Sequence, residues 1–151
     1  FAKKNKIKYH VINYSKKKQA ENKILRYLKK NKIDLVCLAG FMKILSSDFI
    51  NKFKKPILNI HPSLLPKYKG LNTHRRAIKN NDKFSGATVH FVTPKLDSGK
   101  IILQKKVKIS KIETENTLAK KVLKIEHKLY PAAIEKILKN SSLQRKILTQ
   151  F

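Results

Sequence analysis

Asn59 and His61 stand two residues apart at the exit of the apolar stretch ILNI, within the segment NIHPSLLPKYKG. In an extended chain both side chains point to the same face, while Ile60 between them points into the packing. An amide donor beside an imidazole can stabilise the oxyanion of a tetrahedral intermediate and move a proton. The same spacing also suits a strand end whose polar side chains cap backbone groups, and spacing alone favours neither interpretation.

His90 and Asp97 are the next candidates for acid–base chemistry. His90 lies in an expected strand, GATVHFV, where a lone histidine is more often a structural group than a catalyst. Asp97 is one of nine acids against 36 bases and lies in a Leu-Asp-Ser-Gly turn, where an aspartate usually bonds its own backbone. Brought next to His61, however, its carboxylate would stabilise the protonated imidazole.

The sequence offers no metal site and no phosphate loop. The five histidines never fall at ligand spacings such as i, i+4, and the single cysteine, Cys37, has no partner for a metal site or a disulfide. The four glycines are isolated, so no Gly-rich phosphate loop is present. Cys37 lies in an apolar run and is expected to behave as a small core hydrophobe.

Apolar runs alternate with longer amphipathic stretches along the chain, which indicates an α/β protein with a mostly parallel sheet and helices on its faces. Strands are expected at residues 8–13, 34–39, 57–60, 87–92 and 101–109. Within the strand expected at 34–39, residues 35–39 are all apolar, so this strand should be buried on both faces. The last two strands are close enough in sequence to pair as a hairpin, so the sheet should be mixed.

Helices are expected at residues 15–30, 47–53, 73–80 and 114–139. Ser15, Ser46 or Ser47, and Thr114 are suitable caps for three of them. Pro131 should kink or restart the last helix. Beyond residue 140 the chain offers at most a short edge strand.

The formal net charge of +27 raises the question of a nucleic-acid partner. Only four of the 36 basic residues are arginines, and the lysines are scattered, so a solvated cationic surface without a specific nucleic-acid site is expected. No apolar run is long enough to span a bilayer, and the first residues lack a signal-peptide core. We therefore expect a cytoplasmic protein of one domain that does not bind membranes.

Four stretches occur in order between Asp34 and Pro131: LAGFMKILS, LNIHPSLLPKYKGLNTHRRAI, GATVHFVTPKLDSGKIILQ and IEHKLYP. In this order and spacing they resemble the folate-dependent N-formyltransferase family. The resemblance implies a Rossmann-like formyltransferase fold with a C-terminal hairpin. It also implies transfer of a formyl group from 10-formyltetrahydrofolate to the primary amine of glycinamide ribonucleotide in purine biosynthesis, by a monomer or a homodimer without a metal.

The resemblance also implies roles for individual residues. The family's catalytic Asn, His and Asp fall on Asn59, His61 and Asp97. Asn59 and protonated His61 would stabilise the oxyanion, while Asp97 would tune His61 and relay a proton through water. His90 matches a histidine beside this trio and would support it.

Binding of the two substrates is implied for two further groups of residues. The folate would lie against the segment from Val92 to Asp97 and against a loop after an expected strand, formed by Met42, Lys43, Ile44 and Leu45. Lys43 stands where an arginine is common in the family. The flat, forked contact that an arginine makes would therefore be lost. Pro62 and Glu126 would contact the glycinamide ribonucleotide, with Glu126 binding its ribose hydroxyls.

The front of the chain departs from the family pattern. Residue 1 is Phe1 and the only methionine is Met42. The strand, phosphate-binding loop and helix with which family members open are not found. We therefore expect residues 1–151 to be a single formyltransferase domain without its first βαβ unit, with an unpaired sheet edge and little activity alone.

Three other functions are alternatives to this one. Formyltetrahydrofolate deformylase uses the same Asn, His and Asp but lets water attack, although Pro62, Pro66 and residues 71–75 look more like the transferase. Methionyl-tRNA formyltransferase fits less well, because its residues around the histidine differ. A lysine-rich nucleic-acid-binding module would instead show a salt-dependent affinity that survives replacement of His61.

Overall fold

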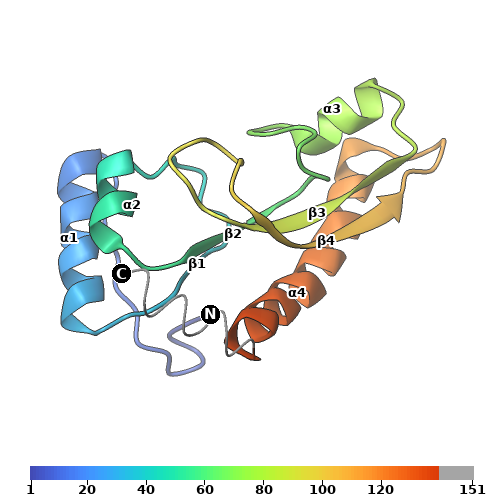
Figure 1. The fold of residues 1–151 in the computed structure, drawn as a ribbon. Helices are drawn as coiled ribbons and strands as arrows, with labels where there is room; N and C mark the ends of the chain where they lie inside the picture. The colour runs from blue at the N-terminus through green and yellow to red at the C-terminus, as the bar shows by residue number, and fades with distance from the viewer. Residues whose placement is uncertain (140–151) are drawn as a thin grey trace.

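The structure is a computed structural model that describes residues 1–139, so the edge strand expected after residue 140 lies outside the described residues. Helices and strands alternate along the chain, except that the last two strands follow one another (Figure 1). They are α1 (Lys17–Lys30), β1 (Val36–Leu38), α2 (Ser47–Phe53), β2 (Ile57–His61), α3 (Thr73–Lys79), β3 (Phe84–Phe91), β4 (Ile101–Lys108) and α4 (Glu115–Lys139). The α/β class expected from the sequence is confirmed.

The sheet has four strands in the order β1-β2-β3-β4. β1 pairs with β2 in parallel, whereas β2 with β3 and β3 with β4 are antiparallel. The sheet is therefore mixed, as the nearness of the last two strands predicted. Among the described residues, fewer strand pairs are parallel than expected. The short turn between β3 and β4 can join only antiparallel strands, so these two strands form a hairpin.

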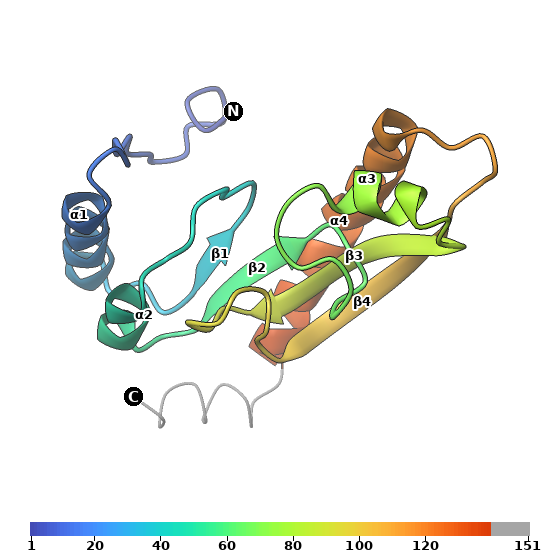
Figure 2. The same cartoon turned by 90° about the horizontal axis from the view of Figure 1, so that it is seen from above.

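Two clusters of apolar side chains hold the helices to the sheet. The first joins α1 and α2 to the β1–β2 pair, through Leu25, Leu28, Leu45, Phe49, Phe53 and Ile57. The second joins α3 and α4 to β3, through Ala77, Ala87, Val89, Leu118, Val122, Leu129 and Ala133. Figure 2 shows α1 and α2 together beside the β1 end of the sheet, with α4 crossing behind β3 and β4.

Strand β2 contributes side chains to both clusters. Ile57 belongs to the first cluster and Ile60 packs against the second. Because side chains alternate along a strand, Asn59 and His61 share the face of Ile57, beyond the apolar part of that face. Apolar packing thus fixes β2 and aims its two polar residues to the same side.

Leu118 provides a test of the second cluster. Its side chain is fully buried in α4. Replacing it with alanine should lower the free energy of unfolding by about 3 kcal/mol, because the lost contacts and the remaining cavity both cost stability. Urea unfolding of Leu118→Ala measures this. Leu123→Ala on the exposed side of the same helix should cost clearly less, and equal losses would contradict the assigned core.

Two expectations for the first residues are wrong. Residues 8–13 form no strand and pair with none of the described strands; instead the His10 ring lies 4.3 Å from the Tyr27 ring of α1. A β-favouring composition forms a strand only where a neighbouring strand pairs with it. Ser15 does not cap α1, because Lys16 is the capping position, and the Ser15 backbone N–H bonds the Asn13 side chain instead.

Two further expectations need correction. Cys37 is exposed and β1 is only partly buried, because β1 is the edge of the described sheet and one of its faces is left open. Helix α4 continues through Pro131, so the restart offered as one alternative does not occur, while a kink at that residue stays a prediction. Burial of Leu129 and Ala133 on either side of the proline favours the helix over the lost hydrogen bond. Among the described helices, none combines the length and the apolar character needed to cross a bilayer.

Candidate active site

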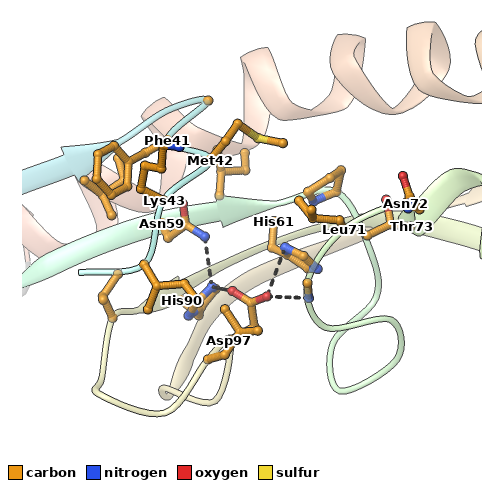
Figure 3. A pocket seen from close by; sticks show the side chains of 18 of the residues that line it. Phe41, Met42, Lys43, Asn59, His61, Leu71, Asn72, Thr73, His90 and Asp97 are labelled. Carbon is orange, nitrogen blue, oxygen red and sulfur yellow. Dashed lines mark hydrogen bonds and ion pairs between the residues drawn. The ribbon is translucent and has the colours of Figure 1, made fainter. Parts of the chain in front are cut away.

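A cavity of about 520 Å³ opens where β1, β2 and β3 end, a volume typical of small-molecule sites (Figure 3). Its wall comes from the loop after β1, the exit of β2, the loop before α3, the turn after β3, and one side of α4. Every residue predicted for the site lines it: Met42, Lys43, Ile44, Leu45, Asn59, His61, Pro62, His90, Val92, Asp97 and Glu126. Their individual roles stay predictions.

The register of β2 and β3 brings Asn59 and His90 together. Asn59 pairs directly with His90 in the antiparallel ladder, and directly paired residues point to the same face. The Asn59 Nδ2 atom lies 3.4 Å from His90 Nε2. Strand pairing, which spacing along one strand cannot reveal, therefore places His90 in the site.

Asp97 faces both histidines. Its Oδ2 atom lies 3.5 Å from His61 Nδ1, and its Oδ1 atom lies 3.6 Å from His90 Nε2 (Figure 3). The Gly70 backbone N–H donates to Oδ2 at 2.8 Å. Asp97 has a φ of +43°, a left-handed conformation that aspartate tolerates better than most residues and that turns its carboxylate inward. The turn expected from the sequence is thus also the turn that delivers the carboxylate.

A backbone carbonyl fixes the proton arrangement of His61. Its Nε2 atom lies 2.8 Å from the Tyr68 carbonyl oxygen. Because a carbonyl can only accept, Nε2 must carry a hydrogen, and the neutral ring keeps its lone pair on Nδ1. Nδ1 faces Asp97 and the cavity.

His90 is held as a neutral ring. Burial lowers its pKa, although its bond to the Phe91 carbonyl and the charge of Asp97 act in the opposite direction. His90 Nδ1 donates to that carbonyl at 2.8 Å, which leaves Nε2 as an acceptor for the Asn59 amide. The contact of His90 with Asp97 therefore joins a carboxylate to a neutral imidazole. Asn59 is oriented with its NH₂ group in the site and has a second hydrogen for a ligand.

The cavity carries a further acid. Glu126 on α4 is half-buried, and burial raises the pKa of its carboxyl, against the opposing effects of His127 and His61. It lines the same cavity as Asp97 and shares no hydrogen bond with it among the described residues. A polar ligand in the cavity would hydrogen-bond to the carboxylates of both Glu126 and Asp97.

Sequence reasoning missed part of the lining. The further lining residues include Phe41, Leu71, Asn72, Thr73, His74 and Glu115. His74 is the most notable of these, because burial lowers its pKa and its Nδ1 atom is buried without a partner among the described residues. The segment LNTHRR belongs to a quoted stretch near His61. Loops have no periodicity, however, so the sequence could not say which of its side chains face inward.

A buried carboxylate, also missed, anchors the loop that follows β1. Ser46 caps α2 as predicted, with its Oγ accepting from the Phe49 N–H at 3.0 Å. Glu21 of α1 accepts from the Ser46 N–H at 2.9 Å, from the Ser46 hydroxyl, and from the Tyr14 hydroxyl at 2.8 Å. Glu21 therefore fixes the residue directly after Leu45. An acid among lysines on an amphipathic helix looks like a solvated residue, so only the tertiary contact reveals it.

Glu21 should make stability depend on pH. Burial alone would raise its pKa, but the bonds from Ser46 and Tyr14 outweigh burial and hold the pKa below the ordinary 4.5. A depressed pKa gives stability that is complete above pH 4.5 and is lost as the pH falls through the folded value. At neutral pH, Glu21→Gln should cost about 2 kcal/mol of unfolding free energy.

Urea unfolding of the wild type and Glu21→Gln over a range of pH checks this prediction. The difference between them should narrow as the pH falls below 4.5. Asp48→Asn is the matched control, because the Asp48–Lys52 ion pair is exposed and contributes little. A difference that stayed constant with pH would contradict the assigned role of the carboxylate.

Comparison with known proteins gives a consistent result. The family profile described as formyl transferase matches residues 1–134. The chain is 50% identical over 101 residues to phosphoribosylglycinamide formyltransferase of Escherichia coli, covering 67% of this chain and 48% of that protein. It is 44% identical over 128 residues to the human trifunctional purine biosynthetic protein adenosine-3, covering 83% of this chain and 13% of that protein.

Solved structures agree with the sequence comparisons. The phosphoribosylglycinamide formyltransferase of Bacillus halodurans superposes with a TM-score of 0.86 at 36% identity, covering 93% of this chain and 74% of that one. The enzyme of the same name from Brucella melitensis gives 0.85 at 43% identity, covering 92% and 73%. The chain spans about half or less of the length of the curated relatives given above. With a profile match over most of its length and the same fold, this chain belongs to the formyl transferase family.

Proposed function

We propose that the protein transfers a formyl group from 10-formyltetrahydrofolate to the primary amine of glycinamide ribonucleotide. The meeting of Asn59, His61 and Asp97 at one wall of a ligand-sized cavity carries this proposal. These are the residues that the family resemblance assigned to catalysis. Relatives named phosphoribosylglycinamide formyltransferase, among them the enzyme from E. coli, support the choice of acceptor.

The site geometry supports a direct attack of the amine on the formyl carbon. As the C–N bond forms, the formyl oxygen becomes an oxyanion, which Asn59 Nδ2–H and protonated His61 Nδ1–H are placed to stabilise. The new ammonium loses a proton, and the leaving N10 of tetrahydrofolate gains one. Asp97, next to His61 Nδ1, is positioned to assist this transfer through water. The products are a formamide and tetrahydrofolate.

The two substrates would occupy different walls. The loop of Met42 and Ile44 presents apolar side chains that are 72% and 56% exposed, a surface suited to the flat pterin and benzoyl groups of a folate. Leu45 is buried in the first apolar cluster, so it would contribute through its backbone. Pro62 and Glu126 also line the cavity and would contact the ribonucleotide, with Glu126 accepting hydrogen bonds from ribose hydroxyls.

The purified protein, as the cell makes it, should convert 10-formyltetrahydrofolate to tetrahydrofolate only when glycinamide ribonucleotide is present. The measurement is the change in folate absorbance, combined with identification of the formylated product. Formate release without the ribonucleotide would favour hydrolysis and contradict the proposal. Affinity for RNA or DNA that persisted in His61→Ala, without formyl transfer by the wild type, would favour a nucleic-acid-binding module.

We further propose that residues 1–151 form a single formyl transferase domain. The profile match supports this for most of the chain, and so do the two apolar clusters that hold the helices to one sheet. A cytoplasmic location and a monomeric or homodimeric state stay predictions. Among residues 1–139, no group of three potential ligands gathers at a metal-binding distance.

A further inference from the structure

A network outside the cavity converges on the carbonyl that bonds His61. The loop between β2 and α3 carries Tyr68, whose φ of +55° is left-handed, and Gly70, with a φ of +77°. The Tyr68 carbonyl accepts from His61 Nε2, and the Gly70 N–H donates to Asp97. One short loop thus fixes both partners of the proposed acid–base pair, and a bulky residue holds an unfavourable backbone conformation there.

The Tyr68 side chain is anchored at its far end. Its hydroxyl donates to Asp82 Oδ2 at 2.8 Å and accepts from Asn80 Nδ2 at 2.9 Å. Lys67 Nζ lies 3.0 Å from the other carboxylate oxygen of Asp82. The ring also packs against the second apolar cluster. Asn80 and Asp82, which follow α3, therefore fix the position of the Tyr68 ring. Through the ring they fix the direction of the Tyr68 carbonyl.

Arg76 of α3 holds the same loop from outside. Its guanidinium lies over the Tyr68 ring, 4.9 Å from the ring centroid. Its Nη1 atom donates to the Lys69 carbonyl at 2.7 Å and lies 3.4 Å from the Leu71 carbonyl oxygen. One nitrogen of Arg76 thus contacts the carbonyls on both sides of Gly70 while the flat guanidinium stacks on Tyr68, a combination that a lysine cannot reproduce.

We propose that Tyr68 and Arg76 are positioning residues for His61. Neither lines the cavity, so neither would touch a substrate. They hold the Tyr68 carbonyl against Nε2, which keeps the neutral imidazole protonated there and leaves Nδ1 for Asp97 and the reaction. The catalytic meaning of this arrangement rests on the proposed formyl transfer, whereas the effect on the tautomer does not.

The tautomer is measured directly by two-bond ¹H–¹⁵N correlation of the His61 ring, assigned with His61→Gln, at a pH where His61 is neutral. In the wild type the Nε2–H form should dominate. Tyr68→Phe keeps the ring but loses the bonds to Asp82 and Asn80, and Arg76→Ala removes the outer clamp. Both should increase the share of the Nδ1–H form.

Steady-state kinetics provide the second readout. In Tyr68→Phe and Arg76→Ala the kcat should fall roughly tenfold while KM for both substrates stays within about twofold, because only the alignment of His61 changes. Arg76→Lys keeps the positive charge but should behave like Arg76→Ala. This result would show that the contacts of the guanidinium matter, and not its charge alone. Arg75→Ala, its exposed neighbour, should match the wild type in every readout.

Several outcomes would overturn the proposal. One is an unchanged tautomer in both variants, whether or not kcat falls. Another is a lower unfolding midpoint as their only effect, which would make Tyr68 and Arg76 merely structural. If the wild type transferred no formyl group, the proposed function would fail, and the NMR comparison alone would still decide whether the two residues position His61.

Discussion

Replacing His61 with alanine should reduce kcat/KM for formyl transfer by roughly 10²- to 10⁴-fold, the range expected when a positioned acid–base group is lost. The reason is specific to its surroundings. Nε2 is committed to the Tyr68 carbonyl, so Nδ1 is the proton-carrying atom at the oxyanion. His90 cannot substitute for it, because His90 uses Nδ1 for the Phe91 carbonyl and turns Nε2 toward Asn59.

The neighbouring variants sharpen this prediction. Asn59→Ala removes one oxyanion donor and should cost roughly 10²- to 10³-fold in kcat. His61→Ala combined with Asp97→Ala should cost little more than the worse single variant, since the two act as one unit. His10→Ala, an exposed histidine beside α1, is the control and should leave kcat/KM unchanged. Additive losses in the double variant would contradict the coupling of His61 and Asp97.

Gly99→Ala should have the second large effect, through sterics. A Cβ atom there would lie 1.8 Å from the Phe91 carbonyl oxygen and 2.7 Å from its carbon, so backbone must move. That oxygen accepts the hydrogen bond from His90 Nδ1, and the same turn presents Asp97. We expect a loss of about 3 kcal/mol in unfolding free energy and roughly 10²-fold in kcat.

Urea unfolding and kinetics of Gly99→Ala measure both parts of that effect. Lys100→Ala, next to Gly99 in the sequence, is the matched control, because its side chain is exposed and the substitution adds no atoms. It should change neither stability nor kcat appreciably. Wild-type stability and activity in Gly99→Ala would show that the turn can relax without disturbing Asp97, against the proposed geometry.

Patterns that depend on nearby residues were predictable from the sequence. The Ser46 cap, the apolar faces of the helices and the strand exit at His61 follow from period and propensity. The residues of the cavity could be named because they occur in ordered stretches that resemble a family.

Features that depend on distant partners were not predictable. The strand expected at residues 8–13 failed because strand formation needs a paired neighbour, and Cys37 is exposed because the edge of the described sheet runs along β1. Glu21 bonds a serine 25 positions away. The His61 tautomer depends on a left-handed Tyr68 in an irregular loop. Local pattern carries none of this information.

Asn59, His61 and Asp97 are proposed to act together in transferring a formyl group to an amine. Single-turnover reaction with ¹³C-formyl-labelled 10-formyltetrahydrofolate and glycinamide ribonucleotide tests it most directly. The wild type should place the label in a formamide, while the folded triple variant Asn59→Ala, His61→Ala, Asp97→Ala should leave it on the folate. Transfer to the amine at the wild-type rate by the triple variant would contradict the account.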